Sequence, residues 1–372
     1  MNLAAANNQS LADFSTTVVH MAMAVYVLAF LGHVAEWVFG TRSRVARTAA
    51  ALSPGRGGER EPGRRAAAVP EVRVKGAKAT RGGGTTVLDR PKVVSRSSTG
   101  RADVPDGPGA AAGDEQGDLY GTIALALTIL AFCIHAVGVV TRGLSVGRVP
   151  WANMYEFSTT FSVLAVGSYL AMVLAKKNVR WLGLPLVTTV LLDLGLATTV
   201  LYTESDQLPP ALDSYWLVIH VSLAIACGAL FYLGAVGTGL YLFRDHYEAK
   251  LERGGKPGAF ATSVLERLPS AASLDKFAYR LNAAVFPFWT FTIVAGAIWA
   301  ESAWGRYWGW DPKEVWSFIT WAAYACYLHA RATAGWRGRK AAYLALIAFA
   351  TFLFNYYGVN FLFNGQHSYA GV

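Results

Sequence analysis

The segment from Trp304 to Trp316 reads WGRYWGWDPKEVW and holds four of the twelve tryptophans in this 372-residue chain. Flat amphipathic rings of this kind grip large apolar ligands, and Gly305 and Gly309 let the backbone turn closely between them. Tryptophans also gather in belts at membrane interfaces. The density of rings here, together with glycines and a carboxylate, favours a platform that grips a flat apolar ligand over a simple belt.

The carboxylate in this segment predicts where a helix begins. Asp311 can cap a helix N-terminus, Pro312 suits the first turn, and Glu314 stands three residues after Asp311 as in a capping box. We therefore expect Asp311 to be a structural cap and not an acid catalyst.

Two of the seven histidines lie near the same predicted membrane edge as the tryptophans. His220 is about six residues into an apolar stretch, and His367 follows the last apolar stretch. Two neutral imidazoles can occupy both axial positions of a haem iron, but a hydrogen-bonded structural histidine explains each residue equally well from its position alone.

The other histidines divide into three groups. His329 lies fourteen residues into its apolar stretch, about 21 Å along a helix, and so cannot share a haem plane with the first two. His246 falls in a charged segment and is expected to be solvated. The rest lack a surrounding motif and are expected to be packed or interfacial: His20, His33 and His135.

The elements that must position these side chains are transmembrane helices. Residues are 53% hydrophobic and only 15% charged, and a span needs roughly 20 apolar residues. The sequence predicts an all-α integral membrane protein with about eight such helices. These are Ser15–Phe39, Leu119–Thr141, Tyr155–Ala175, Trp181–Tyr202, Ser214–Phe243, Leu281–Ala300, Val315–Ala332 and Ala341–Phe363.

Charge distribution predicts the orientation. Most of the 33 lysines and arginines fall in alternate connections, which places those connections in the cytoplasm and both termini outside, N-out and C-out. The Trp-rich loop, residues 301–314, then faces outward. The net charge of +9 thus reflects membrane topology and is no sign of nucleic-acid binding. The first helix lacks a basic leader and a cleavage site, so we expect it to be retained.

Three regions follow from this pattern. Residues 1–41 contain the first helix, 42–118 form a basic cytoplasmic loop expected to be disordered, and 119–372 form a seven-helix core. The three cysteines fall in predicted helices and form no C-x-x-C-H motif, so the chain is not itself a c-type cytochrome.

Four segments resemble one family of haem-handling proteins. WGRYWGWDPKEVW is similar to the "WWD" signature, and YLHAR at Tyr327–Arg331 continues that likeness. LPPALDSYWLVIH at Leu208–His220 and NGQHSY at Asn364–Tyr369 resemble segments that carry haem-ligand histidines. Together they are similar to the CcsA/CcsB/ResC branch of System II cytochrome c biogenesis. The resemblance does not extend to residues 42–118.

The resemblance implies two sites for non-covalent haem b. His220 and His367 would ligate iron at an outer site, and His329 would ligate it at an inner site whose second ligand comes from a ResB-type partner. The residues implied to contact haem are Trp304, Gly305, Tyr307, Trp308, Trp310, Asp311, Trp316 and Arg331.

The implied function is haem delivery across the membrane and thioether formation with C-x-x-C-H apocytochrome c, as a haem lyase component. Catalysis would rest on positioning and on control of the iron by its axial ligands, with no separate catalytic residue. The resemblance also implies thiol-reducing proteins of the pathway as partners and the bacterial plasma membrane as location, with a thylakoid relative as the alternative. Two other functions stay open: a haem transporter or chaperone without ligation activity, and a multi-pass transporter with an aromatic gate.

Overall fold

A computed structural model describes residues 3–39, 110–205, 208 and 212–367. The chain divides into two units, Met1–Pro54 with Ala112–Val372, and Gly55–Ala111. The expected disordered loop, residues 42–118, lies outside the described residues up to residue 109. Its last residues, 110–118, are helical and form the start of the helix that was expected from Leu119.

Every regular element among the described residues is helical, in agreement with the all-α expectation. The helices are α1 (Leu3–Phe39), α3 (Ala110–Val146), α4 (Met154–Leu174), η1 (Arg180–Leu182), α5 (Gly183–Thr199), α6 (Tyr215–Glu252), α7 (Ala259–Leu265), α8 (Ala271–Trp304), α9 (Pro312–Ala332), α10 (Arg339–Leu353), the π-helical turn η3 (Phe354–Gly358) and α11 (Val359–Leu362).

Seven of these helical segments are long and apolar enough to cross a membrane, which confirms an integral membrane protein. The eighth expected span, Val315–Ala332, does form helix α9, but it is not apolar enough to be counted among the seven. Charged and polar side chains lie at both ends of this helix: Lys313 and Glu314 in its first turn, and His329 and Arg331 in its last turn.

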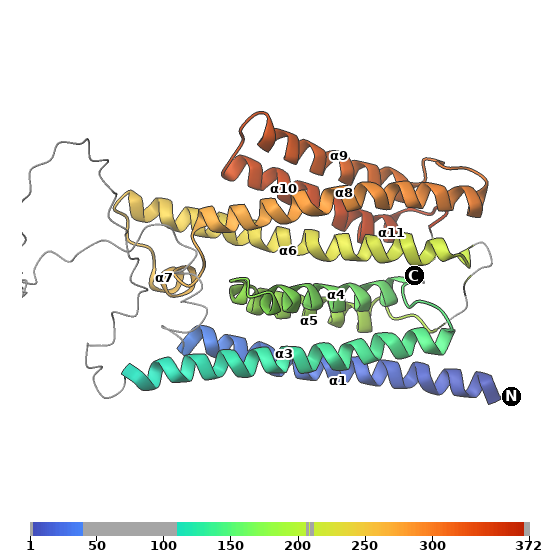
Figure 1. Ribbon diagram of the computed structural model, residues 1–372, viewed down its shortest axis with the longest axis horizontal. Helices are drawn as coiled ribbons and strands as arrows, with labels where there is room; N and C mark the ends of the chain where they lie inside the picture. The colour runs from blue at the N-terminus through green and yellow to red at the C-terminus, as the bar shows by residue number, and fades with distance from the viewer. Residues whose placement is uncertain (1–2, 40–109, 206–207, 209–211, 368–372) are drawn as a thin grey trace, which may run out of the picture. The chain divides into compact units, whose positions relative to one another are not determined.

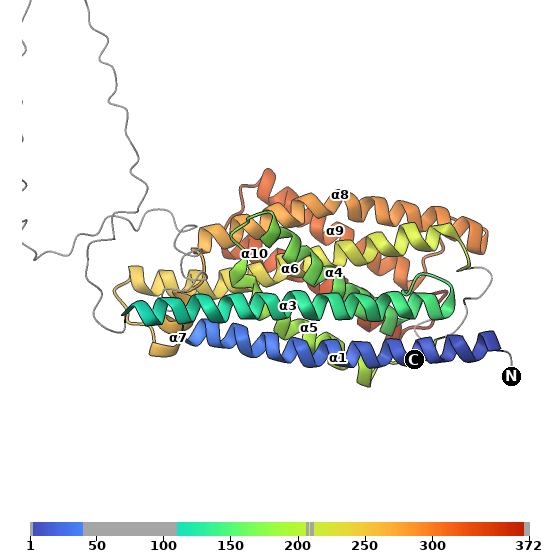
Figure 2. The ribbon, with the colours of Figure 1, turned by 60° about the horizontal axis from the view of Figure 1, so that its bottom comes forward.

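The long helices run side by side and alternate in direction (Figures 1 and 2). One end gathers the start of α1, the connection from α8 to α9, and the last described residues. We call this the outer end, since the charge distribution predicts that it faces away from the cytoplasm. The Trp-rich loop and both helix termini that flank it lie there, at the right of Figure 1.

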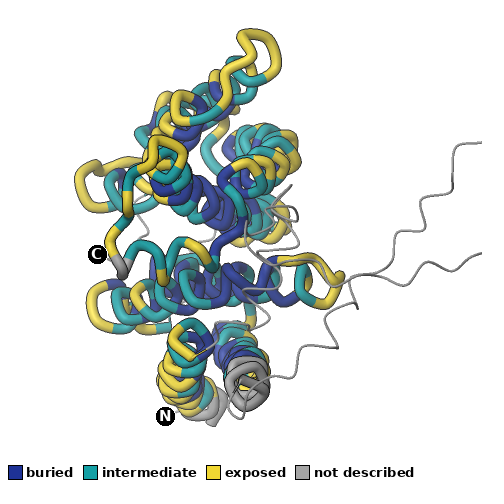
Figure 3. Tube along the Cα trace, turned by 90° about the vertical axis from the view of Figure 1, so that its left-hand side faces the viewer, coloured by how far each residue is buried: buried dark blue, intermediate teal, exposed yellow. Residues whose placement is uncertain are grey.

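Buried residues lie on the sides of the helices that face other helices, whereas exposed residues lie on the outer sides (Figure 3). One core cluster joins α1, α4, α5 and α6, and a second joins α6, α8, α9 and α10. Large apolar side chains such as Leu144, Leu174 and Leu192 are exposed on the helix surfaces. A lipid environment accounts for this exposure, because outside a membrane such surfaces would be unfavourable.

Helices α6 and α8 extend beyond the expected spans at the inner end. Helix α6 continues from the expected Phe243 to Glu252, and α8 begins at Ala271, ahead of the expected Leu281. Charged residues continue these helices past the apolar segments. On α6, for example, Arg244 forms an ion pair with Glu248, one helical turn further on. Hydropathy marks where a helix leaves the membrane, not where the helix ends.

The remaining histidines lie away from the Trp-rich loop. His33 is buried on α1 between Thr128 and Glu36, and His135 is buried on α3 edge-on to the ring of Tyr26. His20 is exposed and bonds to its own helix, and His246 is exposed. The cysteines are unpaired: Cys227 is buried, while Cys133 and Cys326 are exposed.

Candidate functional site: an aromatic cavity between two histidines

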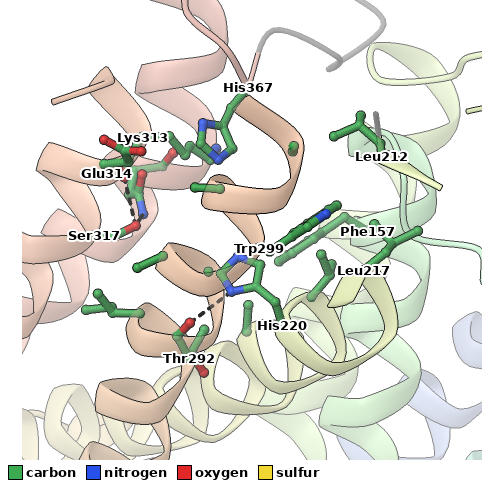
Figure 4. A pocket seen from close by; sticks show the side chains of 18 of the residues that line it. Phe157, Leu212, Leu217, His220, Thr292, Trp299, Lys313, Glu314, Ser317 and His367 are labelled. Atoms are coloured by element: carbon green, nitrogen blue, oxygen red, sulfur yellow. Dashed lines mark hydrogen bonds between the residues drawn. The ribbon is translucent and has the colours of Figure 1, made fainter. Parts of the chain in front are cut away.

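A cavity of about 200 Å³ opens among the outer ends of α4, α6, α8, α9 and η3. Its wall is mostly apolar and aromatic, with a few polar side chains, as in sites that bind small organic molecules. The aromatic residues that line it are Trp151, Phe157, Trp289, Trp299, Trp304, Tyr307, Trp308, Phe352 and Tyr356. His220 and His367 line it too (Figure 4).

The Trp-rich loop forms one rim of this cavity. Helix α8 ends at Gly305, whose φ of 70° is a left-handed conformation that glycine adopts without strain. The loop then places Trp304, Tyr307 and Trp308 along the cavity. Trp310, itself left-handed at φ 57°, is largely exposed and stands edge-on to Trp308.

Four predicted contact residues in and beside the Trp-rich loop do not line the cavity. Gly305, Trp310 and Asp311 are absent from the lining, and Trp316 packs on Phe354 with ring centroids 4.1 Å apart. These residues shape the loop and support α9. Their predicted contact with haem stays a prediction.

Asp311 begins α9 with the predicted capping box. Its side chain accepts from the backbone N–H of Lys313, and the Glu314 carboxylate accepts from the backbone N–H of Asp311, which confirms the prediction. Glu314 also accepts a hydrogen bond from the backbone N–H of Gly309 at 2.8 Å, and this bond holds the Trp-rich loop against the start of α9.

The same Asp311 side chain holds His367. Nδ1 of His367 donates to Oδ2 of Asp311 at 2.8 Å, and the backbone N–H of Gln366 donates to Oδ1 at 2.6 Å. Burial of Asp311 opposes ionisation, but the bonds from His367 and Gln366 prevail and lower the pKa of Asp311 below its usual value. The His367 ring also lies edge-on to Trp304, 5.0 Å between centroids. Gln366 and His367, which follow α11, are thus fixed to the Trp-rich loop.

His220 is held in a corresponding way on the other side of the cavity (Figure 4). Its Nδ1 lies 2.9 Å from the backbone oxygen of Thr292, and since a carbonyl only accepts, Nδ1–H is the donor. Gly296, one turn later on α8, leaves room for the ring: a Cβ there would lie 2.6 Å from Cε1 of His220. Trp299 stands 5.9 Å away, centroid to centroid.

Both histidines therefore share a feature of metal-binding imidazoles. In such sites one ring nitrogen donates to a carboxylate or carbonyl, which fixes the tautomer and makes the other nitrogen the ligand. Asp311 and the Thr292 carbonyl take this role here. The arrangement can present two Nε2 atoms to one cavity, as an iron porphyrin with two axial imidazoles requires.

The connection before α4 supplies another wall. Trp151 and Asn153 line the cavity, whereas Tyr155 and Glu156 of the same segment turn into the protein core. Glu156 is fully buried and pairs with both Arg142, at 3.1 Å, and Arg148, at 2.8 Å. It also accepts from the backbone N–H of Ala152 at 3.0 Å, so this buried group holds the wall in place.

A polar corner lies where α9 meets the π-helical turn η3. Nζ of Lys313 donates to the backbone oxygen of Asn355 at 2.8 Å, and Nδ2 of Asn355 donates to Oγ of Ser317 at 3.0 Å. All three residues line the cavity. π-Helical turns are rare in proteins, and those that occur are often found at functional sites. Sequence inspection did not single out Lys313 or Asn355, because it offers no sign that the two segments meet.

Burial lowers the pKa of Lys313, which stands in the first turn of α9 outside the seven spans, to about 7, although the charge of Asp311 opposes the shift. The side chain retains some exposed surface. Since Lys313 also lines the cavity, a ligand there lies beside this residue.

The predicted inner residues lie far along α9 from this cavity. His329 is exposed on the helix surface and does not line the cavity. Arg331 forms two hydrogen bonds to Asp275 of α8, at 2.6 and 2.9 Å, and its guanidinium lies 4.4 Å from the ring centre of Tyr279. The fold thus brings His220 and His367 together and keeps His329 apart.

Known proteins are similar to most of this chain. Residues 151–367 match the family model described as cytochrome C assembly protein. The chain is 36% identical over 293 residues to the cytochrome c biogenesis protein CcsA of Synechococcus elongatus, covering 67% of this chain and 86% of that protein. It is 35% identical over 283 residues to the CcsA protein of Solanum tuberosum, covering 69% and 88%. The matched family segment begins at the cavity wall and ends at His367.

Proposed function

Because this chain belongs to the CcsA/ResC family of cytochrome c biogenesis proteins, we propose that it holds haem b in the outer cavity and takes part in its covalent attachment to apocytochrome c. Haem is here a substrate in transit, not a resident cofactor. The family membership establishes the role in cytochrome c biogenesis, and the finer assignment is our proposal.

The observation that carries the proposal is the convergence of His220 and His367 on one aromatic cavity. Each ring has its Nδ1 on an oxygen acceptor, from Thr292 and Asp311 respectively. Tryptophan and tyrosine side chains provide the flat apolar wall against which a porphyrin can pack.

The protein's contribution to the chemistry is positioning. In thioether formation, the sulfur and hydrogen of each cysteine thiol add across a vinyl double bond of haem, and no atom is lost. The cavity residues would orient the porphyrin so that its vinyl edge faces the incoming C-x-x-C-H segment, and proximity of this kind can supply much of the rate. The axial imidazoles would tune the iron.

We further propose an inner haem site at His329, completed by a ligand from a ResB-type partner. The support is positional: His329 is exposed on α9, where a second chain can reach it. Thiol-reducing proteins would supply apocytochrome with reduced cysteines. We place the protein in the bacterial plasma membrane, with haem moving from the inner to the outer site.

The test is an absorption spectrum of the detergent-purified protein, reduced, as wild type and as the double variant His220→Ala/His367→Ala. We expect a bis-imidazole haem spectrum that the double variant loses. Replacement of His246, which is exposed and distant, by alanine is the matched control. A double variant that keeps the wild-type spectrum would exclude the outer site.

Haem transport or chaperoning without ligation is the second candidate, favoured by the exposed position of His329 outside the cavity. Co-expression with a ResB-type partner and a C-x-x-C-H apocytochrome separates the two. Haem that stays attached to the apocytochrome after denaturation supports ligation, and bound haem that is always released on denaturation supports transport alone.

A further inference from the structure

We propose that Lys313 binds a carboxylate of the ligand in the outer cavity, so that the propionate edge of haem faces the corner between α9 and η3. This inference rests on the proposed function and deepens it, because it assigns an orientation to the porphyrin.

Lys313 is the only lysine or arginine among the described residues that line the cavity. Its Nζ donates to a neutral carbonyl, that of Asn355, and no described carboxylate forms an ion pair with it. Asp311 attracts its charge from a distance, but the oxygens of Asp311 accept from other donors: His367, Gln366 and the Lys313 backbone. Apart from this carbonyl, the ammonium group faces the ring of Tyr356, 5.8 Å from the ring centre. A largely buried ammonium group without an anion is unfavourable. A ligand carboxylate would supply the missing anion.

A second observation points to the same corner. Oδ1 of Asn355 is buried and has no hydrogen-bond partner, on a residue that is 6% exposed and lines the cavity. Buried polar groups of this kind nearly always have a partner, so its absence indicates a place for a ligand or water. Rotation of the amide by 180° exchanges its oxygen and nitrogen, and the amide can then donate to a carboxylate. The Ser317 hydroxyl, which donates its one hydrogen to the Lys313 carbonyl, then turns that hydrogen to Oδ1 of Asn355.

Glu314, the one acidic residue among the described residues that line the cavity, does not pair with Lys313. Oε2 of Glu314 accepts from the backbone N–H groups of Gly309 and Asp311, in the Trp-rich loop. Lys313 instead reaches towards η3. The Glu314 carboxylate thus bonds to the Trp-rich loop, whereas the Lys313 ammonium group points to η3. The carboxylate edge of the ligand would therefore lie at η3, and its remaining edges would lie along the aromatic wall.

The experiment compares the affinities of the purified chain for haem and for the dimethyl ester of haem, which keeps the iron and porphyrin but has no free carboxylate. The variants are Lys313→Met, Lys313→Arg and, as matched control, Lys340→Met, which removes an exposed lysine from the far end of α10. A charge-assisted hydrogen bond predicts that Lys313→Met weakens haem binding roughly ten- to hundredfold. The ester should bind Lys313→Met and wild type alike, and Lys313→Arg should retain most of the affinity for haem.

The experiment distinguishes failure of the Lys313 inference from failure of the proposed outer haem site. If Lys313→Met leaves haem affinity unchanged, or weakens haem and ester equally, including loss of both, Lys313 has no carboxylate role and this inference is wrong. If the wild type binds neither compound, or binds both independently of His220 and His367, it is the proposed outer haem site that fails.

Discussion

Asp311 and His367 lie 56 residues apart in sequence, yet Oδ2 of Asp311 accepts a hydrogen bond from Nδ1 of His367 at 2.8 Å. One carboxylate thereby starts helix α9, orients a candidate iron ligand and fixes Gln366 and His367 after α11. The capping role follows from the local sequence. The second role depends on the return of α10 and α11 to the outer end.

Replacement of Asp311 by asparagine tests this double role. Three donors meet the two oxygens of Asp311, whereas an asparagine offers one oxygen and a donor of its own. We expect haem affinity at the outer site to fall about ten- to hundredfold, the range found when partners of metal-ligating histidines are lost. Absorbance titration with haem measures it. Ser270→Ala is the control, since it removes the side-chain cap of α8 at the inner end, away from His367. Equal losses of haem affinity in both variants would show that Asp311 acts only by stabilising its helix.

Gly296 provides a test of the position of His220. An alanine Cβ would lie 2.6 Å from Cε1 of His220, so the ring must shift. Alanine is otherwise favoured over glycine inside helices by about 1 kcal/mol, so folding should not suffer. We expect Gly296→Ala to weaken haem binding while thermal stability is kept. Gly239→Ala on α6, which meets no atom within 4 Å, should leave binding intact. Unchanged binding in Gly296→Ala would show that the ring position is not critical.

Glu156 should be important for stability because it is the shared partner of two arginines. Its side chain is fully buried and those of Arg142 and Arg148 are nearly so. Glu156→Gln leaves buried positive charge uncompensated, and we expect a loss of about 3–5 kcal/mol in the free energy of unfolding. Denaturation in detergent followed by tryptophan fluorescence measures this. Glu248→Gln, in a more exposed pair with Arg244, should cost about 1 kcal/mol or less.

The pair of Arg331 with Asp275 separates a structural role from a haem-binding role for this arginine. If the pair only joins α9 to α8, Arg331→Met and Asp275→Asn should lower the unfolding temperature to similar extents, with little further loss in the double variant. If Arg331 also binds haem at the inner site, only Arg331→Met should reduce the haem content of the complex with a ResB-type partner. Purification of each variant with and without that partner decides between the two.

His329 should matter only when a partner is present. We expect His329→Ala to leave the haem spectrum of the isolated chain unchanged, because His329 lies outside the outer cavity and is exposed. Co-purification with a ResB-type partner should then show less haem in the variant than in the wild type. Equal haem content in both complexes would remove His329 from the proposed inner site.

Local features of the chain were predictable from sequence because they depend on neighbouring residues. Apolar stretches long enough to span a membrane fixed the helices, and Asp311, Pro312 and Glu314 indicated the capped start of α9. The structure differs from the expected spans where a helix continues past its apolar segment, as at the inner ends of α6 and α8. Helix α9 forms where it is expected, although its polar ends leave it less apolar than the seven spans.

Composition, hydropathy and local motifs were sufficient to predict the all-helical membrane class, the aromatic loop and the family likeness. The pairing of polar groups depends on the folded chain: Nδ1 of His220 meets a backbone oxygen of Thr292, which no side-chain pattern reveals, and Lys313 meets the carbonyl of Asn355 in the π-helical turn. The fold also joins Arg331 to Asp275. The physical reason is that these contacts form between helices far apart in sequence, and side-chain packing along each whole interface sets how the helices align.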